Sequence, residues 1–499
     1  MVTNQVAAAT GTGRAQGMTG GALAVLLTAT FIGAFDVFVV NVAAPSLQRD
    51  LHASDALLQL VVGGYAFAYA AGLITGGRLG DVFGHRRMYV AGMVAFTVSS
   101  LACGLARSPV ELVAARLAEG LSAAAMLPQV LALITATISP PSRPRALGLY
   151  GLAAGAGSIA GEVLGGVLVS ANLAGLGWRL IFLINLPIGA VTAVLAARWL
   201  PDPATRRGRA NLDLPGALGV ACTLALALLP LTVGADEGWP PWTWAALGAA
   251  VPAGAVTLWW QRRLGRAENG HRGQPVLDLS LFRHWTFRAG LAANACFLAY
   301  FGSFMFALTL FLQDGLRLDA LQAGLAFAPA GVMFSAAALA GSRVLHRYGP
   351  RAVVAGSLIT VAALALLLVL AHAGANRANL PWIILVAAVA SLGNGIVLPA
   401  LIGTSLVKVA PHQAGAGAGL LTTAQQFASS AGVAVIGTVF FVIAGRSHSS
   451  PGGFAAGMTA AAGACLALLT AVTVLTALIA RTTRRDEAPR RQDARRTRS

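Results

Sequence analysis

Long apolar stretches alternate with short polar segments along almost the whole chain. Each stretch has about the 20 residues that an α-helix needs to cross a hydrocarbon core of roughly 30 Å. The pattern predicts an all-α polytopic membrane protein. It has fourteen expected spans, at residues 20–45, 57–77, 88–107, 110–137, 146–170, 180–200, 213–234, 242–261, 288–313, 320–342, 352–372, 381–402, 420–444 and 455–480.

Composition agrees with this pattern. Of the 499 residues, 57% are hydrophobic and 11% are charged, whereas a soluble domain carries about 25% charged residues. The net charge of +17 does not indicate nucleic-acid binding, because the basic residues lie in short loops between apolar stretches rather than on a soluble face. The four cysteines are scattered within apolar stretches without metal-ligand spacing, which favours a packing role: Cys103, Cys222, Cys296 and Cys465.

The distribution of arginine predicts the orientation. Arginines gather in the loops after even-numbered spans and in the segment from Arg481 onward, and few lie in the other loops. By the positive-inside rule both termini are expected to be cytoplasmic. The wealth of Ala, Gly and Arg suggests a bacterial source, so the expected location is the bacterial cell membrane. We expect residues 1–19 to form a cytoplasmic segment, and residues 481–499 to form a basic, disordered tail near anionic lipid.

A repeated loop divides the chain. Residues 78–86 (RLGDVFGHR) follow the second span, and residues 343–351 (RVLHRYGPR) follow the tenth, with arginine, aliphatic, aromatic and glycine positions at the same offsets. A loop that recurs in equivalent places indicates duplicated halves. We therefore predict six-helix bundles at 20–200 and 288–480, with two inserted helices at 201–287.

Five segments together resemble one family. They are residues 36–45 (DVFVVNVAAP), 77–87 (GRLGDVFGHRR), 112–120 (LVAARLAEG), 157–166 (GSIAGEVLGG) and 178–189 (WRLIFLINLPIG). In this order they resemble the motifs of the fourteen-helix drug:proton antiporters of the major facilitator superfamily (EmrB/QacA type). The chain departs from that pattern at Phe38 for threonine, Glu119 for glutamine and Glu162 for proline.

The resemblance implies roles for these motifs. The loop after the second span would gate the conformational change, with Asp81 pairing with an arginine or a helix N-terminus; its members are Gly77, Asp81, Gly84, Arg86 and Arg87. Arg116 would take part in proton coupling. The glycines of the fifth span would let helices approach closely: Gly157, Gly161, Gly165 and Gly166.

Three carboxylates lie inside predicted spans: Asp36, Glu119 and Glu162. A charge at the centre of a membrane helix costs about 2.5–3.5 kcal/mol or more, so each is a candidate functional residue. Counted along their helices, all three lie roughly 12–14 Å from the outer face, which favours a shared site. We expect Asp36 and Glu162 to bind a proton or cation. Arg116 and Glu119, three residues apart, would form a tuning pair or a purely structural ion pair.

Aromatic residues are candidates for a substrate cavity: Phe38, Tyr65, Phe297, Phe301 and Phe304. Aromatic faces suit flat amphipathic or cationic molecules, although packing against lipid or protein is an equally simple explanation. The sequence has no phosphate-binding loop of the G-x-x-x-x-G-K-[ST] type, so we expect a proton gradient to supply the energy for transport. We expect no cofactor and no metal.

The sequence predicts a monomeric exporter of antibiotic-like molecules that exchanges them for protons. A proton symporter that takes up a nutrient is the alternative within transport. A membrane enzyme or receptor is the alternative outside it, but the short loops offer no room for a catalytic or sensory domain.

Overall fold

The computed structural model describes residues 18–139, 141–201, 213–234, 237–265, 279–348, 351–372, 376–406, 409, 414–445 and 451–496. Helices joined by short loops make up this part of the chain, and no strand occurs in it. The predicted all-α class is confirmed.

The first half of the molecule contains six crossings. They are α1 (Gly20–Leu51), α2 (Asp55–Phe83), α3 (His85–Leu105), α4 (Pro109–Thr137), α5 (Arg143–Ala171), and a sixth formed by the short α6 (Leu180–Leu183) and α7 (Asn185–Trp199). Within this half α1 packs on α5, α2 on α4, and α3 on both α4 and α7.

The second half repeats this packing. Its helices are α10 (Trp285–Leu310), α11 (Ala320–Tyr348), α12 (Arg351–His372), α13 (Leu380–Leu406), α14 (Ala414–Gly445) and α15 (Pro451–Arg496). Here α10 packs on α14, α11 on α13, and α12 on both α13 and α15. Each contact matches one between the equivalent helices of the first half, as expected for duplicated halves.

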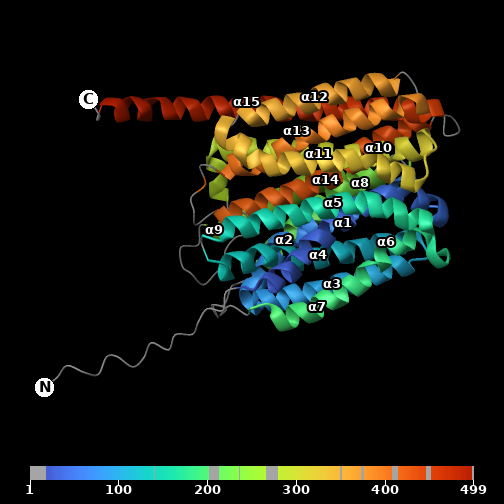
Figure 1. Cartoon of the computed structure of the whole chain (residues 1–499), viewed down its shortest axis with the longest axis horizontal. Coiled ribbons are helices and arrows are strands. Elements are labelled where there is room, and N and C mark those ends of the chain that lie inside the picture. The colour runs from blue at the N-terminus through green and yellow to red at the C-terminus, as the bar shows by residue number, and fades with distance from the viewer. Residues whose placement is uncertain are drawn as a thin grey trace.

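The two halves meet along two helix pairs, α5 with α11 and α2 with α14, and α5 and α11 lie side by side at the centre of the molecule (Figure 1). Among the described residues, four polar contacts join the halves at one end, which we call the α1–α2 end because the loop between these helices lies there. They are Gln313 Nε2 to Val42 O at 2.7 Å, Leu321 N to Ser170 Oγ at 3.0 Å, Thr438 Oγ1 to Gln59 Oε1 at 3.3 Å, and Arg49 Nη1 to Asp314 Oδ1 at 3.4 Å.

Two further helices lie between the halves in sequence, α8 (Leu214–Val233) and α9 (Pro241–Gly265). They pack on each other, and Asp213 at the start of α8 accepts hydrogen bonds from Trp260 Nε1 at 2.9 Å and Gln261 Nε2 at 2.7 Å on α9. Thirteen helices of the described residues are long and apolar enough to cross a membrane. The helix predicted as the eighth span, α9, is 25 residues long but is not among those thirteen.

The expectation of a disordered tail is wrong, because α15 continues as a helix to Arg496 (Figure 1). Extending an existing helix adds one hydrogen bond per residue without a new nucleation cost, and the Arg, Ala and Glu of this segment are good helix formers. Two other expectations fall outside the described residues: the segment 1–17, and the side chains at 342–350 in the second copy of the repeated loop.

Candidate functional site

An arginine lies buried at the centre of the first half. Helix α4, which carries it, begins after Ser108, whose side chain accepts a hydrogen bond from Glu111 N at 3.2 Å, and Pro109 suits the first helical turn. Two turns later the helix carries Arg116 and Glu119, both with 0% of their surface exposed. Positions three apart share a helix face, so both side chains point the same way.

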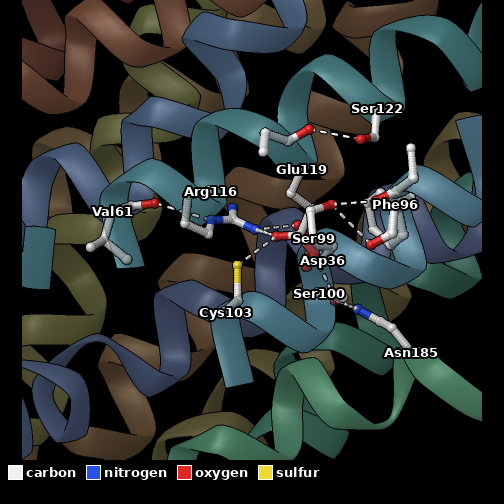
Figure 2. Close-up of polar contacts among 12 residues, drawn as sticks. Asp36, Val61, Phe96, Ser99, Ser100, Cys103, Arg116, Glu119, Ser122 and Asn185 are labelled. Atoms are coloured by element: carbon white, nitrogen blue, oxygen red, sulfur yellow. Dashed lines mark hydrogen bonds and ion pairs between the residues drawn. The ribbon is translucent and has the colours of Figure 1, made fainter. Parts of the chain in front are cut away.

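Two carboxylates share this guanidinium, as Figure 2 shows. Arg116 Nη1 donates to Asp36 Oδ2 on α1 at 2.5 Å and to Glu119 Oε2 at 2.6 Å. Both carboxylates contact the same nitrogen, so they must also lie close to each other. We call Asp36, Arg116 and Glu119 the buried ion cluster. The predicted pairing of Arg116 with Glu119 is present, and Asp36 joins it.

Helix α3 completes the surroundings of Glu119 (Figure 2). Ser100 Oγ donates to Glu119 Oε1 at 2.6 Å, and Cys103 Sγ lies 3.5 Å from Oε2. Asn185 Nδ2 on α7 donates in turn to Ser100 Oγ at 2.9 Å. Sequence reasoning missed these three residues as site members. Asn185 lies in the motif at 178–189, but nothing in its spacing shows that it faces α3.

The remaining groups around Arg116 come from α2 and the sixth crossing. Arg116 Nε donates to the carbonyl oxygen of Val61 at 3.2 Å. The guanidinium carbon lies 4.6 Å from the centroid of the Tyr65 ring and 5.8 Å from that of Phe182. Tyr65 therefore contributes its aromatic face to the cation. Its hydroxyl has no hydrogen-bonding partner among the described residues.

The two carboxylates differ in how well they are hydrogen-bonded. Both oxygens of Glu119 accept hydrogen bonds, from Ser100, Cys103 and Arg116. Asp36 Oδ2 accepts one from Arg116, whereas Asp36 Oδ1 is buried without a partner in the described part of the chain. A buried polar oxygen without a partner is costly, and Oδ1 is the one carboxylate oxygen of this cluster that has no hydrogen-bonding partner among the described residues.

Glu162 lies outside the buried ion cluster, so the structure does not bring all three carboxylates together. Glu162 is 7% exposed. It lies on the side of α5 that faces α11, because a Cβ added to Gly324 of α11 would lie 2.6 Å from the carbonyl oxygen of Glu162. It forms no ion pair or hydrogen bond with any described residue. Equal depth along the helices did not place Glu162 near Asp36, because the two residues face different neighbours.

Four of the five candidate cavity aromatics form a connected group across the two halves, whereas Tyr65 lies apart from them at the buried ion cluster. Phe38 on α1 meets Phe301 on α10 edge to face, with centroids 6.1 Å apart, and Phe301 stacks on Phe334 of α11 at 6.0 Å. Phe297 and Phe304 lie on the same helix as Phe301 and are fully buried. The rings of Phe38 and Phe301 keep partial exposure. Their role in binding a substrate stays a prediction.

The loop between α2 and α3 is tightly built at Gly84, whose φ of 97° lies in a region that favours glycine. Asp81 is mostly exposed, and its Oδ1 lies 3.5 Å from Nε2 of His85. His85 Nδ1 lies 2.8 Å from Gln129 Oε1, and Arg86 donates to the carbonyl of Ala197. Gly77 lies one turn before Asp81, and Arg87 is exposed at the start of α3. In this arrangement Asp81 pairs within its own half.

The glycines of α5 permit two close helix contacts. A Cβ at Gly157 would lie 2.3 Å from the carbonyl oxygen of Phe31, and one at Gly161 2.6 Å from that of Phe35, so neither position has room for a side chain. Gly165 packs on Val39 in the same way, whereas Gly166 packs on Ala320 of α11. Small residues thus bring α5 close to both α1 and α11.

Comparison with known proteins agrees with the fold. The model of the Major Facilitator Superfamily matches residues 26–433. The chain belongs to the major facilitator superfamily. It is therefore a multi-pass membrane transporter, with the buried ion cluster inside its first half.

Curated relatives of this superfamily member include transport, export and resistance proteins of Streptomyces and Amycolatopsis. The chain is 37% identical to the probable actinorhodin transporter of Streptomyces coelicolor, over 86% of this chain and 74% of the relative. It is 35% identical to a cephamycin export protein of Amycolatopsis lactamdurans, over 84% of both chains. It is 33% identical to the tetracenomycin C resistance and export protein of Streptomyces glaucescens, over 81% and 73%.

Solved structures confirm the fold of this superfamily. A bacterial homologue of the human lysosomal transporter Spinster, in an inward-facing and occupied conformation, matches with a TM-score of 0.66 and 18% identity. The match covers 92% of this chain and 96% of the other.

Proposed function

We propose that the protein exports amphipathic, antibiotic-like molecules in exchange for protons, as a member of the fourteen-helix drug:proton antiporter group. The observation that carries this proposal is the sharing of Arg116 by Asp36 and Glu119 in a site sealed from solvent. The names of the relatives support export of antibiotic-like compounds.

The charges of the buried ion cluster suit a proton carrier. With both carboxylates ionised, two negative charges face one positive charge, which leaves a net charge of −1. A buried net charge is unfavourable, and one proton removes it. The two carboxylates then titrate as a pair that holds a single proton.

We infer the roles within the pair from their hydrogen bonds. Glu119 is fully satisfied as an acceptor, so it serves as the ionised partner that holds Arg116 in place. Asp36 Oδ1 has no partner in the described part of the chain, so it receives the proton. Asp36 lies on α1, which packs along α5 and thus beside the boundary between the halves. A proton at this position is placed to influence how the halves rock.

The contacts between the halves fit one step of alternating access. The polar contacts at the α1–α2 end hold that end together, and the positive-inside rule assigns it to the outside. Asp81, expected to brace the cytoplasmic side when that side is closed, pairs instead with His85 in its own half. Loading of a substrate from the cytoplasm would follow from this state, and protonation from outside would follow after rocking.

Accumulation of substrate inside everted vesicles tests the proposal, because their cytoplasmic face points outward and an acidic interior then supplies the protons that are exchanged. Cells that express the protein are first screened for resistance to a panel of antibiotics and amphipathic dyes, and the transported compound is then followed in vesicles. Wild-type protein should move it only when the gradient is present. Asp36→Asn should abolish this movement because the proton-binding oxygen is lost. Glu111→Gln should retain it, because this variant changes an exposed carboxylate at the start of α4, two turns before Glu119.

Two results would contradict the proposal. Gradient-driven transport that survives in Asp36→Asn would remove Asp36 from proton coupling. Uptake of a solute together with protons, without export of any compound in the panel, would replace the exporter with the nutrient symporter.

A further inference from the structure

Glu162 is a buried acid without a counter-charge among the described residues. The residue is 93% buried within a membrane helix, and no described residue forms an ion pair or a hydrogen bond with its carboxylate. Such a group is expensive in a medium of low polarity unless a proton or a cation accompanies it. Asp36 and Glu119, by contrast, have Arg116 built in beside them. Glu162 therefore has capacity for a positive partner that the described part of the chain does not supply.

The position of Glu162 lies where the two halves meet. Along α5, Ile159 packs one turn earlier against Gly331 of α11, and Gly166 packs one turn later against Ala320. Glu162 sits between these two contacts, at the level of Gly324. Figure 1 shows α5 and α11 running alongside each other through the middle of the molecule. Rocking of the halves changes this contact, so a ligand held here would be exposed and covered in turn.

A row of aromatic rings from both halves begins beside this position. A Cβ on Gly161, the residue before Glu162, would lie 3.0 Å from the Cβ of Phe38. Phe38 meets Phe301, and Phe301 stacks on Phe334, so three partly exposed rings connect α1, α10 and α11. Ser335, which follows Phe334, has a buried hydroxyl without a partner in the described chain. Aromatic faces attract both flat rings and cations.

We propose that Glu162, together with Phe38, Phe301 and Phe334, forms a binding site for the cationic group of a flat aromatic substrate. The carboxylate takes the positive charge, such as a protonated amine, and the rings take the planar apolar part. Glu162 thus selects substrates by charge and does not carry the coupling proton, which belongs to the buried ion cluster. This assignment rests on the proposed export function and adds the chemical class of its substrate.

Binding of two matched ligands tests this inference without any gradient. 10-Methylacridinium is a permanent planar cation, and 10-methylacridone is an uncharged molecule with the same ring system. Both are titrated by fluorescence against purified full-length protein in lipid nanodiscs. Glu162→Gln should weaken binding of methylacridinium roughly ten- to a hundred-fold, as loss of a buried charged partner does. Binding of methylacridone should stay within about two-fold of wild type, which also shows that the variant is folded.

Two further variants sharpen the test. Glu162→Asp keeps the charge and should retain preference for the cation. Glu237→Gln removes an exposed carboxylate in the loop between α8 and α9 and should bind both ligands as wild type does. The inference is overturned if wild-type protein does not prefer the cation, or if Glu162→Gln loses both ligands equally or neither.

If the proposed export function is wrong, the binding and transport measurements give a different combination of results. In that case the preference for methylacridinium and its dependence on Glu162 would persist, while vesicles would show no export driven by a pH gradient. Loss of the preference with intact gradient-driven export would instead overturn the role of Glu162 alone.

Discussion

At the scale of single residues, the buried ion cluster depends on uncharged neighbours. Glu119 is held by the hydroxyl of Ser100, and Asn185 holds that hydroxyl in turn. Tyr65 lies against the guanidinium of Arg116 with its ring and not with its hydroxyl. Each of these contacts can be removed while the three charges stay in place.

Ser100→Ala should lower the free energy of unfolding by about 1–3 kcal/mol, because Glu119 Oε1 loses its donor in a buried place. Ser99→Ala is the matched variant, since the Ser99 hydroxyl bonds only to carbonyls of its own helix, Ala95 O at 2.8 Å and Phe96 O at 3.0 Å. Ser99→Ala should therefore lower the free energy of unfolding much less than Ser100→Ala does. Thermal unfolding of the purified variants in detergent measures both, and equal losses would contradict the assigned role of Ser100.

Tyr65→Phe should leave stability and transport nearly unchanged, because the ring remains and the lost hydroxyl has no partner in the described chain. Tyr65→Leu removes the aromatic face and should lower stability by about 2 kcal/mol, the value of a desolvated cation–π contact. The same unfolding measurement compares the two. A large effect of Tyr65→Phe would mean that the hydroxyl has a role in the cycle.

Sequence reasoning reached part of the site. Asp36, Arg116 and Glu119 stood out because charges are rare inside membrane helices, and the spacing of three put Arg116 and Glu119 on one face. Ser100 and Cys103 gave no such signal, because small polar residues are common in apolar helices and their facing depends on how α3 packs on α4. The depth of Glu162 along its helix also did not reveal that this residue faces α11 rather than Asp36.

At the scale of elements, glycine spacing on α5 sets how closely α1 and α5 approach. The four glycines were visible in the sequence as a packing motif, and their division between α1 and α11 was not. The span pattern located the helices well, because apolar length is fixed by membrane thickness. The end of α15 was missed, because charge suggested disorder where helix propagation continues.

Gly157→Ala should destabilise the first half, because the added Cβ would press on the carbonyl of Phe31 on α1. Gly151→Ala, on the same α5 but with nothing within 4 Å of the new Cβ, should be neutral or slightly stabilising, by up to about 1 kcal/mol from helix propensity. The fraction of protein that remains monodisperse after heating in detergent separates the two. Similar behaviour of both variants would argue against the close contact of α1 and α5.

At the scale of the whole molecule, contacts at the α1–α2 end hold the two halves together. Leu321 on α11 and Ser170 on α5 touch across the boundary, with N and Oγ 3.0 Å apart. A covalent link at this point would prevent the halves from separating there. Transport by alternating access requires that separation.

The double variant Ser170→Cys with Leu321→Cys should lose transport after oxidation and regain it after reduction. Each single variant should transport in both conditions, which excludes an effect of the oxidant itself. Efflux from vesicles before and after treatment with a reductant gives the readout. Full transport by the oxidised, cross-linked double variant would rule out opening at this end.

The single surplus negative charge of the buried ion cluster also determines how the membrane voltage acts on the transporter. One proton entering for one uncharged molecule leaving carries one positive charge inward, so voltage adds about 2.3 kcal/mol per 100 mV to the driving force. One proton entering for one monovalent cation leaving moves no net charge, and voltage then adds nothing. Export measured at potentials set by potassium and valinomycin should therefore be electrogenic for uncharged substrates and electroneutral for cationic ones.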